Sequence, residues 1–281
     1  MSEIRRRFVA GLGFTPDGFQ AASMDAVDQG HSVLVAAPTG SGKTVVAEYA
    51  IERALADGGK AFYTTPLKAL SNQKFTDLQM RHGPTKVGLL TGDNAINANA
   101  PVVVMTTEVL RNMIYAGSSS LDNLRWVILD EVHYLQNPYR GAVWEEVIIH
   151  LPQEANLVCL SATVSNAEDF ADWIATVRGA TDPVIEEHRP VELENLYLVG
   201  ERDSDRLHLM PTFLDDGTPN PKAAELDGRM ATGAPKRYGR RQHLYTPRRV
   251  EVAHVLWDEQ MLPAIYFIFS RKACDLSLIH I

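Results

Sequence analysis

The sequence has few of the features that mark secreted, zinc-stabilised or membrane proteins. It contains two cysteines, Cys159 and Cys274, and neither has a partner Cys or His at the spacing of a metal site. A disulfide framework or a zinc fold is therefore not indicated. No run of eighteen apolar residues occurs, and the N-terminal residues MSEIRRRFVAGLG lack the apolar core of a signal peptide. We expect a cytoplasmic protein that does not enter a membrane.

An excess of basic charge is also missing, because the formal net charge is -8 at pH 7. The overall charge therefore gives no indication of nucleic-acid binding. One segment differs from this average. Residues 229–249 hold seven Lys or Arg and no acidic residue, with Tyr238, His243 and Tyr245 between them. This composition fits contact with nucleic-acid phosphates and bases, and it fits a solvated linker equally well.

Apolar strand patterns alternate with helical patterns from about residue 31 to about residue 185. Because parallel strands are joined by crossover helices, this alternation predicts an α/β fold with a mostly parallel, doubly wound sheet. The expected strands are Ser32–Ala36, Ala61–Thr65, Val87–Leu90, Pro101–Thr106, Trp126–Asp130 and Leu157–Ser161. A chain of 281 residues with 45% hydrophobic composition can form one or two such domains.

A glycine-containing loop, APTGSGKT at Ala37–Thr44, follows the first expected strand and precedes a helical pattern. Glycines let the backbone N–H groups of such a loop point at phosphates, and the helix start adds its dipole. We predict that Lys43 contacts the outer phosphates of ATP and that the Thr44 hydroxyl holds Mg²⁺. The predicted ATP-binding residues of the loop are Thr39, Gly40, Ser41, Gly42, Lys43 and Thr44. The alternative is an ordinary Gly/Ser turn before a helix, and Ala37 stands where the strict pattern has a glycine.

Two carboxylates, Asp130 and Glu131, follow the apolar run Leu124–Leu129. A parallel strand delivers such residues at its carboxyl end, where open α/β sheets bind ligands. We predict that Asp130 holds Mg²⁺ and that Glu131 orients and deprotonates the attacking water, with Lys43 as the third catalytic residue. The alternative is an acidic pair at the surface.

The loop and the LDEVH segment at Leu129–His133 resemble those of superfamily-two DExH helicases of the superkiller (Ski-like) type. That family has a RecA-like ATP-binding domain of the P-loop NTPase class. Phe14–Gln20 (FTPDGFQ) is similar to the family's element before the loop. The resemblance implies that Gln20 reads the adenine edge and that Phe14 lies near the ring. It also implies coupling of the ATP site to movement by His133 and by Ser161, Ala162 and Thr163 (SAT).

Three further motifs resemble family elements that hold the backbone of a nucleic-acid strand: TPLKALSNQK at 65–74, TGD at 91–93 and MTTEVLR at 105–111. The implied contacts are Pro66, Leu67, Lys68, Gly92, Asp93, Thr106, Thr107 and Glu108. Backbone amides and hydroxyls at helix starts bind phosphates without reading sequence. Taken alone, TP or TTE would be an ordinary helix N-cap.

The stretch Arg140–Ile148 (RGAVWEEVI) and the phrase KALSNQK resemble the RNA-processing branch of the family more than its DNA-repair relatives. The resemblance therefore implies an ATP-dependent RNA helicase, with a single-stranded RNA segment as substrate and DNA as the alternative. We expect a monomer that works with RNA-processing proteins. The alternative function is an ATP-gated nucleic-acid clamp, which binds its ligand without unwinding it.

The remaining predictions concern domain organisation. We expect a RecA-like domain at 1–190, a partly irregular basic linker or insertion at 191–249, and the start of a second RecA-like domain at 250–275. The last of these contains a predicted helix at Val250–Gln260 and a predicted buried strand at Pro263–Phe269. Residues 276–281 (LSLIHI) resemble an in-frame reading of a transposase end sequence used in library preparation, so we expect them to be non-native.

An arginine finger, which the family takes from its second RecA-like domain, raises the rate by ~10³–10⁵. We therefore expect this polypeptide alone to be nearly inactive.

Overall fold

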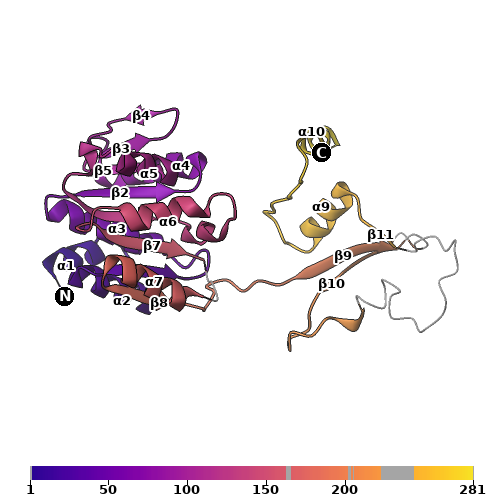
Figure 1. Cartoon of the computed structure of the whole chain (residues 1–281). Helices are drawn as coiled ribbons and strands as arrows, with labels where there is room; N and C mark the ends of the chain where they lie inside the picture. The colour runs from indigo at the N-terminus through magenta and orange to yellow at the C-terminus, as the bar shows by residue number, and fades with distance from the viewer. Residues whose placement is uncertain (1, 163–165, 202–203, 205, 223–243, 281) are drawn as a thin grey trace. The chain divides into compact units, whose positions relative to one another are not determined.

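The structure is a computed structural model that describes residues 2–162, 166–201, 204, 206–222 and 244–280. The chain divides into two compact units, Met1–Val191 and Glu192–Ile281 (Figure 1). None of the helices in these described ranges is both long enough and apolar enough to cross a bilayer.

The first unit is built on an eight-stranded sheet with the order β4-β3-β5-β2-β6-β7-β1-β8. Every neighbouring pair is parallel except β3 and β4, which confirms the predicted mostly parallel α/β fold. The strands are β1 Ser32–Ala36, β2 Lys60–Thr65, β3 Val87–Leu90, β4 Ala95–Ile96, β5 Val102–Thr106, β6 Leu124–Leu129, β7 Asn156–Ser161 and β8 Thr181–Ile185. The six predicted strands are all present, each within two residues of its expected bounds.

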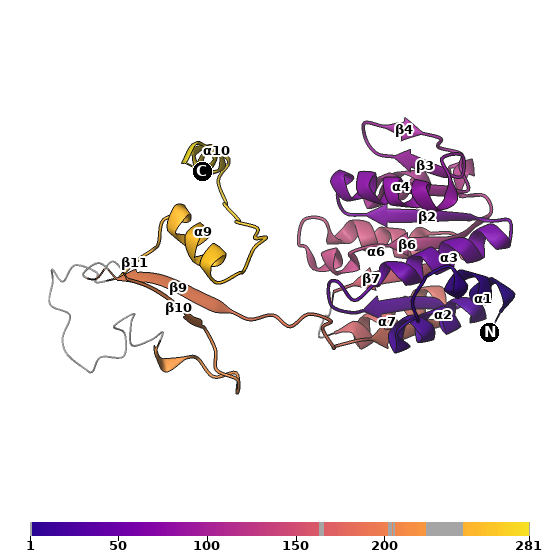
Figure 2. The ribbon, with the colours of Figure 1, turned by 180° about the vertical axis from the view of Figure 1, so that it is seen from behind.

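Helices cover both faces of this sheet, as Figures 1 and 2 show from opposite sides. The helices are α1 Glu3–Ala10, α2 Gly18–Gln29, α3 Thr44–Ala56, α4 Lys68–His82, α5 Thr107–Tyr115, α6 Gly141–His150 and α7 Ala167–Arg178, with short 3-10 helices η1 Ser119–Leu121 and η2 Val132–Gln136. Successive strand residues point to opposite faces, so Val33 and Val35 pack with α1 to α4 while Leu34 and Ala36 pack with α5 to α7. The buried strands need apolar residues on both sides for this reason.

Two strands of the first unit were not predicted from the sequence. The edge strand β8 contains Thr181, Asp182 and Pro183, and it pairs on one side only, with β1. Proline is tolerated in such a strand because an edge position leaves one row of backbone N–H groups unpaired. The other missed strand, β4, has two exposed residues and no apolar pattern to detect.

In the residues that the structure describes, the second unit contains a three-stranded antiparallel sheet with the order β10-β9-β11 and the helices α9 and α10. Its elements are β9 Leu196–Glu201, β10 Arg206–Pro211, β11 Leu244–Tyr245, α9 Arg249–Asp258 and α10 Arg271–His280. Helix α9 confirms the helix predicted at Val250–Gln260. Most of the basic segment 229–249 lies outside the described residues, and only its last six residues, from Leu244, are described.

The strand predicted at Pro263–Phe269 is wrong, because this segment has no strand structure. Most of its apolar side chains are exposed, with Ile265 at 82% and Phe269 at 99% of their full accessibility. A strand needs a neighbour to pair its backbone N–H and C=O groups. No strand pairs with residues 263–269 in the part of this unit that the structure describes.

Candidate ATP and nucleic-acid sites

The loop at Ala37–Lys43 joins the carboxyl end of β1 to the start of α3, and two glycines determine its shape. Gly40 and Gly42 have φ values of 84° and 86°, a left-handed conformation that side chains disfavour. A Cβ atom at Gly42 would also lie 2.7 Å from the side-chain amide nitrogen of Gln20. The loop can therefore approach both Gln20 and an anion closely only with glycine at this position.

Lys43 lies inside this loop. Its ammonium group donates hydrogen bonds to the backbone carbonyls of Ala37 and Pro38, at 2.6 and 2.9 Å. Burial lowers the pKa of Lys43, and the negative charges of Glu131 and Asp130 oppose that shift. The predicted catalytic lysine and both predicted carboxylates therefore lie within electrostatic reach of one another, at the carboxyl ends of the nearby strands β1 and β6.

Asp130 is fixed by hydrogen bonds to both of its side-chain oxygens. The Tyr63 hydroxyl of β2 donates to Oδ2 at 2.7 Å, and the backbone N–H of Glu131 donates to Oδ1 at 2.9 Å. Burial and the charge of Asp130 raise the pKa of Tyr63 well above its usual value, so the phenol remains a donor. Tyr63 is not among the site residues predicted from the sequence. The sequence did contain a signal for its role: a tyrosine within a buried strand needs a hydrogen-bond partner for its hydroxyl.

Glu131 has the unusual left-handed backbone conformation for a non-glycine residue, with φ at 55°. Such conformations cost free energy and are concentrated at functional sites. Its side chain lies 3.3 Å from Nδ1 of His133, the second residue of η2. This contact connects the predicted base to the predicted coupling residue.

Gln20 links the start of α2 to the loop at Ala37–Lys43, which is the predicted phosphate-binding loop and is called the phosphate-type loop below. Its side-chain nitrogen donates to the Gly42 carbonyl at 3.1 Å, and its side-chain oxygen accepts the backbone N–H of Asp17 at 3.0 Å. The residue is 2% exposed, whereas Phe14 is 52% exposed. Contact of either residue with adenine stays a prediction.

Ser161 ends β7 directly beside the loop. Its backbone carbonyl accepts the N–H of Ala37 at 3.2 Å. Its hydroxyl is buried and has no hydrogen-bond partner among the described residues, which is rare for a buried polar group. The adjacent Ala162 is half-buried, and Thr163, the last of the four predicted coupling residues, lies outside the described residues.

The predicted nucleic-acid contacts follow β2, β3 and β5, which are neighbours in the sheet. An ion pair joins Lys68, at the start of α4, to Asp93 after β3. The Thr107 hydroxyl donates to the Thr65 carbonyl at 3.4 Å. The three motifs are therefore brought together, although they are separated in sequence.

Arg140 strengthens this arrangement. Its guanidinium donates to the Pro66 carbonyl at 2.8 Å and pairs with Glu108, so it joins the segments that begin α4 and α5. A planar guanidinium suits such a double contact because its donors are held in a fixed fork. In the sequence, Arg140 is part of a stretch that resembles the family, and no contact of this residue was predicted. Arg140 directly precedes Gly141, where a Cβ would lie 2.0 Å from the Leu135 carbonyl oxygen. This close packing could not be inferred from the sequence without the fold.

The predicted contacts differ in exposure. Leu67, Lys68, Gly92 and Asp93 are exposed, and Glu108 is half-buried. Pro66, Thr106 and Thr107 are buried. A role of these three residues in nucleic-acid binding stays a prediction, and their backbone groups are the atoms that would serve it.

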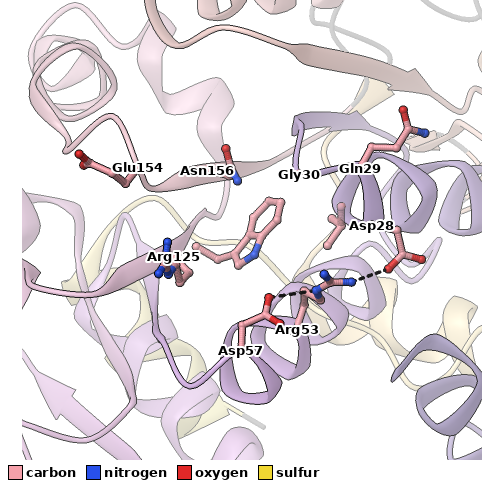
Figure 3. A pocket seen from close by; sticks show the side chains of 10 residues that line it. Asp28, Gln29, Gly30, Arg53, Asp57, Arg125, Glu154 and Asn156 are labelled. Carbon is pink, nitrogen blue, oxygen red and sulfur yellow. Dashed lines mark hydrogen bonds and ion pairs between the residues drawn. The ribbon is translucent and has the colours of Figure 1, made fainter. Parts of the chain in front are cut away.

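A separate pocket of about 400 Å³ lies at the opposite edge of the sheet, near the amino ends of β6 and β7 (Figure 3). It is lined by charged side chains, but Arg53 is already paired with Asp28 at 3.2 Å and with Asp57 at 3.1 Å. Parallel α/β sheets bind ligands at the carboxyl ends of their strands. This pocket is therefore not the candidate site.

Comparison with protein families decides the class. Residues 17–170 match the family described as DEAD/DEAH box helicase, and this span is more than half of the chain. The chain belongs to the DEAD/DEAH box helicase family. The matched span contains the phosphate-type loop, Asp130 and Glu131, and the three motifs after β2, β3 and β5.

Several relatives of this helicase domain are of the superkiller type, which confirms the resemblance found in the motifs. A Mycobacterium tuberculosis protein named "Probable helicase HelY" is 53% identical over 282 residues, covering 96% of this chain and 31% of the relative. Human "Superkiller complex protein 2" is 40% identical, covering 93% of this chain and 22% of the relative. The chain thus spans about a third or less of these two relatives.

A solved structure of the Mycobacterium smegmatis helicase Lhr, bound to ssDNA and AMP-PNP, is 32% identical with a TM-score of 0.56. The match covers 66% of this chain and 28% of that one. It supports the RecA-like fold of the first unit.

Proposed function

We propose that this chain is the ATP-binding part of an ATP-dependent helicase that acts on RNA. One observation carries the proposal. The phosphate-type loop, Asp130 and Glu131 lie at the carboxyl edge of the same sheet as three motifs of the nucleic-acid-binding type. A motor benefits from rigid strands that hold both ligands close together, because binding at one site must change affinity at the other.

The side chains divide the chemistry among them. Backbone amides from Gly40 to Thr44 hold the phosphates, and Lys43 moves from its loop carbonyls to the outer phosphates. Thr44 and Asp130 offer a hydroxyl and a carboxylate oxygen, which are hard ligands that fit Mg²⁺. The metal, when bound, neutralises charge on the phosphate oxygens.

Glu131 is the better base of the two carboxylates. Both oxygens of Asp130 already accept hydrogen bonds, from Tyr63 and from the Glu131 backbone. The Glu131 side chain is 40% exposed, and within the described part of the chain its ion-pair partner is His133 alone, so it can accept a proton from water.

RNA is preferred over DNA because the RNA-processing resemblance at Arg140–Ile148 agrees with the name of a relative that is 39% identical, the Schizosaccharomyces pombe "ATP-dependent RNA helicase mtr4". The Lhr structure was solved with ssDNA, which makes DNA the natural competitor in any binding test. The proposal also includes a monomeric, cytoplasmic protein with RNA-processing partners. Residues 250–275, within the second unit, are then the start of a second RecA-like domain, and residues 191–249 are a linker or insertion.

Strand displacement tests the proposal in the longer protein that we propose contains this chain. An RNA duplex with a 3′ overhang should be separated with ATP and Mg²⁺, and a Glu131→Gln variant should not separate it. Tight, ATP-dependent RNA binding without displacement would instead support the clamp. Displacement of DNA duplexes alone would contradict the RNA assignment.

A phosphate-release assay tests the 281-residue polypeptide itself. We expect almost no RNA-stimulated turnover, because an arginine finger contributes ~10³–10⁵ in rate and belongs to the second RecA-like domain in this proposal. Robust turnover that disappears in Glu131→Gln would contradict this expectation.

A further inference from the structure

Lys74 of α4 contacts the ATP half of the site, although its sequence motif belongs to the nucleic-acid half. Its ammonium group donates to the Thr44 hydroxyl at 3.3 Å. The same group lies 5.9 Å from the centroid of the Tyr63 ring, within the range of a cation–π contact. Tyr63 in turn donates to Asp130. A half-buried cation is thus connected to both predicted metal ligands.

Helix α4 places this cation close to the nucleic-acid half. The helix begins at Lys68, which pairs with Asp93, and Arg140 holds the Pro66 carbonyl just before it. Lys74 follows Lys68 by six residues, which is ~9 Å along a helix. Movement of the start of α4 therefore also moves the Lys74 ammonium group.

We propose that Lys74 is a positioning residue that couples the start of α4 to the metal ligands Thr44 and Asp130. This inference rests on the proposed function, because it requires ATP and Mg²⁺ to bind at this site. Mg²⁺ bound to the Thr44 oxygen at ~2.1 Å would lie no more than about 5.4 Å from the Lys74 nitrogen in its present position. Two cations so close repel each other. Metal binding therefore displaces Lys74, and displacement of Lys74 favours the metal.

Linkage makes this effect reciprocal. If RNA at the start of α4 changes the position of Lys74, RNA changes the affinity for the metal–nucleotide complex, and that complex changes RNA affinity by the same factor. Asparagine or methionine at position 74 would remove the charge. Methionine also keeps an unbranched, flexible side chain at this position.

The test is the binding of a fluorescent ATP analogue to the 281-residue chain, with Mg²⁺ and with EDTA, each without and with single-stranded RNA. Two ratios are measured: the Kd in EDTA over the Kd in Mg²⁺, and the Kd without RNA over the Kd with RNA. Lys74→Met should raise the first ratio about fivefold or more and bring the second close to one. Lys74→Arg, which keeps the charge, should retain most of the wild-type values. Lys86→Met removes an exposed lysine outside the site and should behave as wild type.

The outcomes separate this inference from the proposed function. If the wild-type chain does not bind the analogue, or if Lys43→Ala binds it equally well, the ATP site itself is wrong and the inference falls with it. If wild-type binding depends on Lys43 but Lys74→Met leaves both ratios unchanged, only the role of Lys74 is overturned. A purely structural lysine would weaken binding in Mg²⁺ and in EDTA by the same factor, which also contradicts the proposal.

Discussion

The carboxyl edge of the large sheet has two halves whose polar side chains are held in different ways. In the half formed by β1, β6 and β7, Lys43 and Asp130 are bound to groups of the protein itself. In the half formed by β2, β3 and β5, Lys68 and Asp93 pair with each other, but both are exposed, with side-chain accessibilities of 53% and 73%. The first arrangement suits a small, densely charged ligand held in fixed geometry. The second suits a long polymer bound through its backbone.

The two halves meet between β2 and β6, which are paired in the sheet. Tyr63 crosses this boundary to Asp130, and Lys74 crosses it to Thr44. The comparison therefore leads to specific expectations: variants within one half should affect its own ligand, and variants at the boundary should affect the coupling.

The largest effect is expected from Glu131→Gln in the ATP half, measured as phosphate release by the longer protein that we propose contains this chain. Loss of a general base reduces turnover by ~10²–10⁴. Binding of the ATP analogue and of RNA should remain near the wild-type values, because glutamine keeps the size of the side chain. Equal losses of turnover and of RNA affinity would break the separation of the halves.

Lys43→Ala should have the next largest effect, on nucleotide affinity. Removal of a charge that contacts phosphates directly should weaken binding of the ATP analogue by about 100-fold, which corresponds to about 2.7 kcal/mol. RNA affinity in the absence of nucleotide, measured by fluorescence anisotropy, should not change. A parallel loss of RNA affinity would mean that Lys43 also serves the other half.

Arg140→Met should weaken RNA binding by about tenfold, or about 1.4 kcal/mol, because the starts of α4 and α5 lose their shared anchor. Nucleotide affinity without RNA should stay the same. Arg125→Met is the matched control, since Arg125 is an exposed arginine of the pocket at the opposite edge. If the control weakened RNA binding as much as Arg140→Met, general charge would explain both results.

Lys68→Met should produce the smallest change, in the salt dependence of RNA binding. One lost phosphate contact lowers the slope of log K against log salt concentration by ~0.7 for a single strand. Arg140→Met should leave this slope unchanged, because Arg140 acts on protein groups rather than on phosphate. Identical slopes for wild type and Lys68→Met would remove Lys68 from the interface.

The first unit was largely predictable because each central strand carries its own signal. Strands buried on both faces, such as β1 (SVLVA) and β5 (VVVMT), must be apolar throughout, and their patterns are visible locally. The edge strand β8 was not predicted, and the prediction for the segment at Pro263–Phe269 was wrong, for the opposite reason. Their structure depends on which strands lie beside them, and that information is not local.

In the candidate site, too, residues in continuous motifs were predicted and residues that act between elements were not. The loop around Lys43 and the carboxylates after β6 form continuous motifs, so the sequence predicted them together. Tyr63, Lys74 and Arg140 act across elements that are 30 to 74 residues apart in the chain. Their partners depend on strand order and helix packing, which no single segment encodes.

Amide hydrogen exchange of the 281-residue chain tests the central claim of two ligand-binding halves most directly. The first backbone N–H groups of a helix have no partner within it, so a ligand that accepts their hydrogen bonds slows their exchange. A Mg²⁺–ATP analogue should slow exchange at residues 40–46, and single-stranded RNA should slow exchange at residues 67–70 and 107–110. RNA that protects residues 40–46 and leaves the starts of α4 and α5 unchanged would contradict the account.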